Sequence, residues 1–353
     1  MGAQESDGAR GRAKRLLPRP GRPSVKLSAF TIVDQFPEPE GRGRDRYAEV
    51  LRLAEAAEAS GFSGLWVAEH HFQPGGLCPS PPVLLAACGA RTQRLRLGAM
   101  VSVLPFHRPV DLAEEYALLD RLTHGRVNLG IGSGYIPAEF EGYGVDPTTK
   151  HGRFDSSLAE ILDAFAGREI RASEGAAHPV QLNVRPVQTP HPPLWIAVQR
   201  REAIPFVARR NVSLALIPYA TVSGLPELAD EIREFRAALP TGSRAEVAVG
   251  LHLYAGPHPD RARAALDRFL ASRLKTQSTF YQAKAAHDPH HASRAGLEES
   301  GLALIGPPAE VAERLDAFRR IGVDEVLGML DFGAMPAEDV ADSIRALGAA
   351  VRP

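Results

Sequence analysis

Two kinds of hydrophobic pattern alternate along this chain. Runs that are apolar at every position predict strands of a buried parallel sheet, and segments whose apolar residues recur every three or four positions predict helices that cover it. The predicted strands comprise residues 25–33, 65–69, 95–104, 127–131, 194–198, 214–217, 247–254 and 325–330. The predicted helices comprise residues 44–60, 80–91, 109–122, 153–165, 201–210, 225–239, 259–272, 311–321 and 337–351. Eight strands that alternate with helices predict an α/β fold of the (β/α)8 TIM barrel type, with an open doubly wound sheet as the alternative.

Two segments interrupt this alternation. Residues 167–192 contain the alternating Val180, Leu182 and Val184, which predict a strand outside the barrel. Residues 273–306 are polar and rich in His, so we expect an insertion or mobile lid near the active-site face. The barrel domain is therefore predicted to comprise residues 25–353.

The N-terminal residues differ in composition from the rest. The first 26 carry seven Lys or Arg against two acidic residues, are rich in Gly and Pro, and show almost no apolar periodicity. A segment of this kind cannot bury enough apolar surface to order itself. We expect residues 1–24 to form a disordered basic tail.

Charge and composition exclude several partners. A formal net charge of -1 over 353 residues offers no basic surface for nucleic acid or an anionic membrane. No apolar run approaches the ~20 residues of a membrane span, and no signal peptide opens the chain. Cys78 and Cys88 are the only cysteines and do not form a CxxC pair, so neither a disulfide framework nor a zinc site is indicated. We expect a cytoplasmic protein that acts on a small molecule.

The most informative polar group lies at the end of the second predicted strand, where Glu69, His70 and His71 continue an apolar run. Carboxyl ends of parallel strands are where α/β proteins place their chemistry, although a surface loop with two incidental histidines is the simpler alternative. Adjacent strand residues point to opposite faces, so the two histidines do not favour joint chelation of a metal. Acid–base work or hydrogen bonding on an organic cofactor, with no metal, is the better prediction.

A Gly-rich turn follows the fourth strand, with the sequence GIGSGYIPAEF over residues 130–140. Small residues at this position let a cofactor approach the backbone, although a plain strand-to-helix turn is the alternative. The turn is not a dinucleotide fingerprint, because Tyr135 occupies the position of the third glycine.

The run from Trp66 to Phe72 and this Gly-rich turn together resemble the corresponding segments of the bacterial luciferase-like, flavin-dependent monooxygenases. The resemblance is strongest over residues 61–146. It implies a TIM barrel that binds reduced FMN, reacts with dioxygen and oxygenates a small organic substrate. It also implies a homodimer formed through the first barrel helices. Since the chain contains no nicotinamide fingerprint, we expect a separate reductase to supply the reduced flavin.

The resemblance assigns roles to single residues. His70 would lie against the flavin ring and take part in the reaction with dioxygen, with Glu69 and His71 beside it. Glu139 would supply a carboxylate, and Ser133 would bind the flavin phosphate. A non-proline cis peptide between Met100 and Val101 would support the flavin ring.

The chain departs from the family pattern at two positions of the turn. Gly132 replaces a reactive cysteine of the luciferase α subunit, and Ser133 replaces its phosphate-binding arginine. The cofactor site would also include Gly134, Tyr135 and Gln199, the last at a strand end. We hypothesise that Arg200, together with Arg201, supplies the missing charge at a helix start, where a guanidinium matches a phosphate. A solvated helix start is the alternative, and it is stronger for Arg201.

Two other functions stay open at this stage. A reductase of the same barrel family would use a deazaflavin for hydride transfer, and a non-catalytic paralogue would bind flavin only. Retention of Glu69, His70 and Glu139 argues against the paralogue. Neither the substrate nor the type of oxygenation is indicated by the sequence, because barrel scaffolds host many chemistries.

Overall fold

The computed structural model describes residues 25–36, 43–72, 75–171, 175, 177–276, 286, 288–290 and 292–351. The tail predicted over residues 1–24 lies outside the described residues. No helix in the described ranges is long and apolar enough to cross a membrane.

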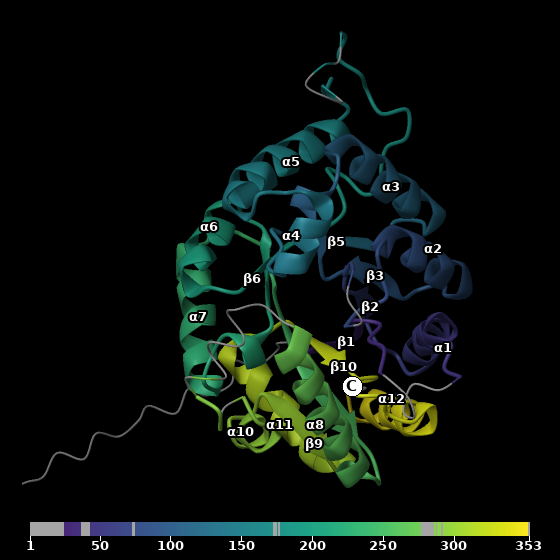
Figure 1. The fold of residues 1–353 in the computed structure, drawn as a ribbon, viewed down its shortest axis with the longest axis vertical. Helices are drawn as coiled ribbons and strands as arrows, with labels where there is room; N and C mark the ends of the chain where they lie inside the picture. Colours follow the sequence, from purple (N-terminus) through teal and green to yellow (C-terminus); the bar gives the residue numbers. More distant parts are fainter. Residues whose placement is uncertain are drawn as a thin grey trace, which may run out of the picture.

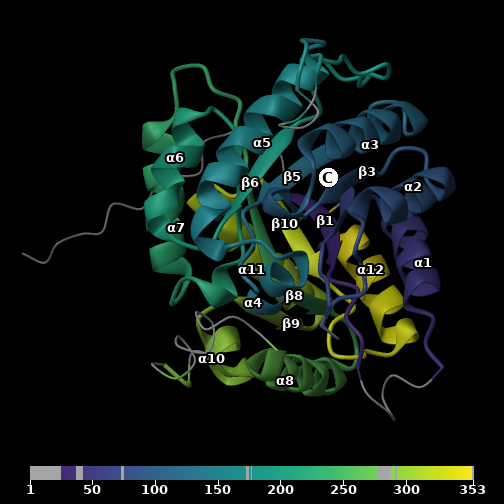
Figure 2. The same ribbon diagram turned by 45° about the horizontal axis from the view of Figure 1, so that its top comes forward.

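A closed parallel barrel forms the centre of the molecule. Its strands are β1 (Lys26–Thr31), β2 (Gly64–Val67), β3 (Arg96–Ala99), β4 (Ser102–Val103), β5 (Val127–Gly132), β6 (Leu194–Val198), β7 (Ser213–Leu216), β8 (Val247–Ala255), β9 (Ala303–Gly306) and β10 (Glu325–Met329). Parallel pairing runs in the order β10-β1-β2-β3-β5-β6-β7-β8, and pairing of β10 with β8 closes the ring. Figure 2 shows these strands surrounded by helices. The closed ring confirms the TIM barrel and excludes the open sheet.

The helices follow the predicted alternation. They are α1 (Arg46–Ala59), α2 (Pro81–Arg91), α3 (Pro109–Leu122), α4 (Pro137–Tyr143), α5 (Lys150–Phe165), α6 (Ile204–Arg209), α7 (Leu225–Ala238), α8 (Pro259–Thr276), α10 (Arg294–Glu299), α11 (Pro308–Ile321) and α12 (Ala337–Val351). Figure 1 shows α1, α2, α3, α5, α6 and α7 in succession around the strands. The pattern missed α4 and α10, because seven and six residues are too few for a helical period to stand out.

The third predicted strand is interrupted. Residues 95–104 form β3 and β4, and the peptide bond between Met100 and Val101, which lies between them, is cis. The cis bond is the one that the family resemblance predicts. A run of apolar residues cannot reveal such a break, because both parts of it are buried.

The predicted strand within residues 167–192 is wrong. The described part of this segment contains one isolated antiparallel bridge, between Ile170 and Val180. Leu182 is buried and Val184 packs against the core while Val180 is exposed, so these residues reflect the packing of a loop against the hydrophobic core.

The region predicted as a lid has more regular structure than expected. Residues 273–276 complete α8, residues 294–299 form α10, and residues 303–306 form β9. β9 pairs in parallel with the last part of β8, from His252 to Ala255. Most of residues 277–291 lie outside the described residues, so the lid role stays a prediction.

Helix α8 lies over the carboxyl end of the barrel. Arg268 donates a hydrogen bond from Nε to the carbonyl of Gly333, in the loop after β10, at 3.0 Å. A Cβ on Gly333 would lie 1.8 Å from the carbonyl oxygen of Ala265, so only glycine allows α8 to approach this closely. Residues 259–272 are helical, as the sequence predicts. Their close contact with the loop after β10 places this helix over the mouth of the barrel.

Candidate active site

Two polar groups far apart in sequence meet at the end of β2. The Nδ1 atom of His70 lies 3.0 Å from Oε1 of Glu139, and the backbone N–H of His71 donates to the same oxygen at 3.0 Å. Glu139 comes from the first turn of α4, which follows the Gly-rich turn, and all three side chains are buried. The structure thus brings together the two residues to which the family resemblance gives the central roles.

Glu69 forms a second buried network beside the first. Its Oε1 accepts hydrogen bonds from Nε2 of His71 at 2.9 Å and from Nε2 of His107 at 2.8 Å, and its Oε2 accepts from the backbone N–H of Val103 at 3.1 Å. Burial raises the pKa of Glu69, but the hydrogen bonds from His107 and His71 outweigh it, so this pKa lies below its usual value. Burial lowers the pKa of His107, but the hydrogen bond to Glu69 outweighs it, so this pKa lies above its usual value. Both shifts favour an ion pair of Glu69 and His107.

Sequence reasoning missed His107. The residue follows β4 and the short 3-10 helix at Leu104–Phe106, immediately before α3. Its position after a strand, next to Arg108 and Pro109, is the only feature of the sequence that could have marked it as a site residue. This feature is weak evidence because many loop histidines are solvated.

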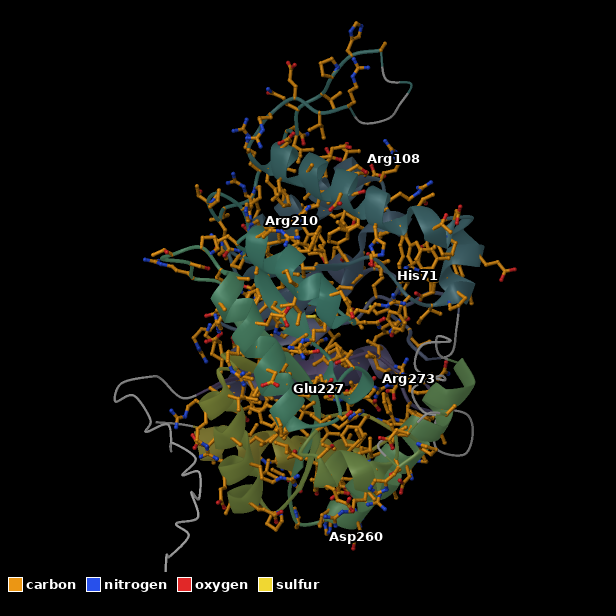
Figure 3. The ribbon with its side chains drawn as sticks, turned by 90° about the vertical axis from the view of Figure 1, so that its left-hand side faces the viewer. His71, Arg108, Arg210, Glu227, Asp260 and Arg273 are labelled. Atoms are coloured by element: carbon orange, nitrogen blue, oxygen red, sulfur yellow. The ribbon has the colours of Figure 1, made fainter. Side chains whose placement is uncertain are left out.

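Aromatic rings hold His71 in place. The hydroxyl of Tyr143 lies 3.1 Å from Nδ1 of His71, and the two rings meet edge to face with centroids 4.9 Å apart. Phe106 stacks on Tyr143 at 4.9 Å and meets Phe140 edge to face at 4.9 Å. Both ring nitrogens of His71 are thereby engaged, so His71 positions the loop, and His70 is the better candidate for contact with a cofactor. Figure 3 labels His71 within the body of the protein.

The Gly-rich turn is tightly packed on one side. A Cβ on Gly132 would lie 2.6 Å from Cγ2 of Val101, so Val101 takes the space that a cysteine side chain would need. Gly134 has a φ of +75°, and a Cβ there would meet Phe140 and Val103 at 3.0 Å. The residues that follow Gly132, up to Tyr135, are half-buried, and Tyr135 turns its ring edge-on to His70 at 6.4 Å.

Lys150 lies beside this turn, and the exposed Arg200 is near enough to Lys150 for their charges to interact. Lys150, the first residue of α5, is half-buried and donates from Nζ to the carbonyl of Gly134 at 3.0 Å. Burial lowers the pKa of Lys150, and the positive charge of Arg200 lowers it further, so the two cations repel each other. A phosphate between them would relieve this repulsion, and the site therefore fits an anionic end of a cofactor.

The remaining predicted phosphate residues are placed differently. Arg201 is exposed and forms an ion pair with Glu234 of α7 at 2.8 Å, which favours the alternative of a solvated helix start for this residue. Gln199 is half-buried directly after β6, next to Arg200. Sequence reasoning missed Lys150, since nothing in a polar loop before a helix marks a lysine as buried.

Comparison with known proteins identifies the class. The sequence model of the family described as luciferase-like monooxygenase matches residues 25–325. This chain belongs to the luciferase-like monooxygenase family.

Its relatives include characterised oxygenases. The chain is 24% identical over 330 residues to the oxygenase component of flavin-dependent trigonelline monooxygenase from Acinetobacter baylyi, which covers 88% of this chain and 90% of that protein. It is 28% identical over 265 residues to limonene 1,2-monooxygenase from Rhodococcus erythropolis, covering 73% of this chain and 68% of that protein. Two uncharacterised proteins of Sinorhizobium fredii are 37% and 38% identical, but the chain matches only about half of their length, 57% and 42%.

Solved structures show the same fold. Monooxygenase RslO1 from Streptomyces bottropensis has a TM-score of 0.77 and 25% identity, and the match covers 92% of this chain and 98% of that one. An FMN complex of the oxygenating constituent of 3,6-diketocamphane monooxygenase from Pseudomonas putida has a TM-score of 0.75 at 18% identity, with 93% and 98% covered. An F420-dependent secondary alcohol dehydrogenase has a TM-score of 0.70 at 16% identity, with 94% and 100% covered. These structures show that the chain has the fold of proteins described as monooxygenases and as an F420-dependent dehydrogenase.

Proposed function

We propose that this chain is the oxygenase component of a two-component monooxygenase. It would use dioxygen and reduced FMN, delivered by a separate reductase, to oxygenate a small organic substrate. The observation that carries the proposal is the buried contact of His70 with Glu139, formed next to a Gly-rich turn that is bound by Lys150, a lysine whose pKa the charge of Arg200 lowers. The name of the relative from Acinetobacter baylyi, an oxygenase component, supports the separate reductase.

Different residues of this chain would bind the cofactor and exchange protons. Lys150 and Arg200 would bind the FMN phosphate, and the glycines of the turn would let the flavin approach the backbone. When bound, reduced FMN would supply the electrons that reduce dioxygen and let one oxygen atom enter the substrate. Glu139 accepts a hydrogen bond from Nδ1 of His70, which fixes the tautomer and leaves Nε2 as the nitrogen that takes up or releases a proton.

The deazaflavin enzyme remains the second candidate, because an F420-dependent dehydrogenase shares the fold. A non-catalytic flavin-binding paralogue is less well supported. The chain contains the buried Glu69–His107 network as well as the His70–Glu139 contact, and buried charged groups cost stability unless they are paired. The cytoplasmic location stays a prediction from the sequence.

Mixing the purified full-length chain with photoreduced FMN, and then with air, tests the proposal. We expect flavin reoxidation to pass through a transient absorbance that differs from both reduced and oxidised FMN. Reduced F420 is run in parallel. If the chain binds F420 more tightly than FMN and does not react with dioxygen, the deazaflavin enzyme is the correct function. If it binds flavin but reacts in neither experiment, it is the non-catalytic paralogue.

A further inference from the structure

One side of the barrel mouth contains a buried imidazole that the proposed reaction does not use. His252 on β8 is fully buried, and in the part of the chain that the structure describes neither of its ring nitrogens has a hydrogen-bond partner. The rings of Phe269, Tyr219 and Phe332 surround it, with centroids 4.7, 5.0 and 5.2 Å from its own. Burial and the charge of Arg273 lower the pKa of His252 to about 3, so the ring is neutral near pH 7 and offers one donor and one acceptor. Buried polar atoms nearly always have partners, so two unmet ones require an explanation.

Arg273 lies next to this ring, in the last turn of α8. It is buried, and its guanidinium carbon lies 5.0 Å from the ring centroid of Phe269, the residue that also contacts His252. Its Nη2 donates to the carbonyl of Gly75 at 3.1 Å, while its Nη1 has no hydrogen-bond partner among the described residues. Among the residues that the structure describes, no carboxylate lies within ion-pair distance of it. A buried guanidinium in this state fits an anionic ligand.

The loop that accepts the hydrogen bond from Arg273, at Gly75, also packs against His70. A Cβ on Gly76, the neighbour of Gly75, would lie 2.7 Å from the Cβ of His70. The backbone N–H of His70 in turn donates to the carbonyl of Cys78 at 3.0 Å. Figure 3 shows Arg273 and His71 on the same side of the protein. A ligand bound by Arg273 would therefore lie next to the residue that we place against the cofactor.

The other charges nearby are already balanced. Arg46 on α1 forms ion pairs with Asp331 at 2.9 Å and with Asp34 at 3.3 Å, and it also contacts Glu49. Asp34 accepts from the backbone N–H of Gly333 at 3.3 Å. Burial and the negative charge of Asp331 raise the pKa of Asp34, while Arg46 and Arg273 lower it, and the net result is a pKa of about 6. Asp34 thus competes with any anion for the charge of Arg273.

We propose that Arg273 and His252 form a substrate subsite that binds an aromatic carboxylate. The inference rests on the proposed function, since it assigns a chemical class to the substrate of that enzyme. Nη1 of Arg273 would donate to one carboxylate oxygen, and the neutral imidazole of His252 would donate to the other. The rings of Tyr219, Phe269 and Phe332 would pack against the planar body of the ligand.

Benzoate and its uncharged isostere benzamide are the probes. Their affinities for the full-length chain are measured by calorimetry, with FMN bound and again without flavin. We expect benzoate to bind more tightly than benzamide. Arg273→Gln is expected to weaken benzoate binding roughly 10- to 100-fold, the range for a lost hydrogen bond to a charged group, and to leave benzamide unchanged. Arg261→Gln is the matched control, because Arg261 is on the same helix but is exposed and lies 3.5 Å from Asp339.

A second variant changes binding in the opposite direction. Asp34→Asn removes the carboxylate that competes for Arg273 while it keeps an oxygen for the N–H of Gly333, so benzoate should bind more tightly near pH 7. Benzamide bound as tightly as benzoate by the wild type would overturn the subsite, whether or not the variants fold. Equal benzoate affinity in Arg273→Gln and the wild type would do so as well. The flavin-free measurement separates the two proposals, since loss of FMN binding alone would count against the oxygenase and not against the subsite.

Discussion

At the scale of single residues, the two carboxylates of the site have different tasks, and their partners set these tasks. Glu139 contacts the ring of His70 and accepts from the backbone N–H of His71, whereas Glu69 accepts from the rings of both His71 and His107 and from the N–H of Val103. Glu69 therefore holds two imidazoles and the start of the next loop in fixed positions. Glu139 orients the imidazole of His70 and can tune the proton exchange of that ring.

His70→Gln should leave folding and FMN affinity nearly unchanged and reduce oxygenation about 100-fold or more, the usual loss when a positioned acid–base group is removed. Substrate turnover with photoreduced FMN measures the change. His71→Gln is the control, and it should lower the melting temperature, because it disturbs contacts at both ring nitrogens. Turnover by His70→Gln at the wild-type rate would contradict the assigned role.

Arg200→Ala and Lys150→Ala should each weaken FMN binding by about 1.5–3 kcal/mol, the range for a hydrogen bond to a charged group. Riboflavin lacks the phosphate, so its affinity should not change in either variant. Arg201→Ala is the matched control, since Arg201 pairs with Glu234. Fluorescence quenching of both flavins measures the affinities, and equal losses for FMN and riboflavin would show that the residues are structural.

The ion pair of Glu69 and His107 should make stability depend on pH. Glu69, with a lowered pKa, contributes stability above its ordinary value of 4.5 and loses it as the pH falls through the folded value. His107, with a raised pKa, contributes stability that is complete below 6.5 and is lost as the pH rises through the folded value. The pair is therefore most stabilising between pH 4.5 and 6.5. Urea unfolding of wild type and His107→Gln should differ most in this window and converge above it, and a constant difference would contradict the ion pair.

At the scale of elements, close packing between strands decides where the site lies. Trp66 of β2 is fully buried, meets Trp195 of β6 edge to face at 5.5 Å, and donates from Nε1 to Glu325 at 3.0 Å. Gly98 of β3 lies flat against the same indole, since a Cβ there would be 2.2 Å from it. The barrel interior next to the site is thus filled by one large ring and the glycine that accommodates it.

Gly98→Ala should therefore destabilise the protein by about 1–3 kcal/mol or more, because Trp66 is held on both sides and cannot move away. Gly152→Ala is the control within an exposed turn of α5, where no atom lies within 4 Å of the new Cβ. It should stabilise the protein by about 0.5–1 kcal/mol, as expected for Gly to Ala in a helix. Denaturant unfolding measures both changes, and a neutral Gly98→Ala would show that the ring can shift.

At the scale of the whole molecule, helices α2 and α3 carry large apolar side chains on their outer surface. Val83, Leu118 and Leu122 are 70%, 52% and 60% exposed. The two helices lie side by side on the barrel, as Figure 1 shows. Exposed apolar residues that gather on neighbouring helices are typical of a contact with another chain.

The homodimer that the family resemblance implies should use this surface. The double substitution Leu118→Glu and Leu122→Glu is expected to convert the dimer to a monomer, because it buries two charges in an apolar interface. Light scattering after gel filtration measures the mass. Arg233→Glu, on the exposed face of α7, is the control and should leave the mass unchanged. A wild-type monomer would contradict the prediction directly.

The sequence by itself determined the barrel, and it indicated the end of β2 as the place of the candidate site. Parallel strands buried on both faces show continuous apolar runs, so their number and order are visible without coordinates, and the Glu69-His70-His71 run marks a strand end. The tertiary structure alone decided which distant groups meet there. His107, Lys150 and Arg273 come from different loops and helices and carry no local pattern, because their burial depends on what packs against them. The same holds for β9 and for the glycines at 98 and 333, since close approach is a property of two segments and the sequence describes each one separately.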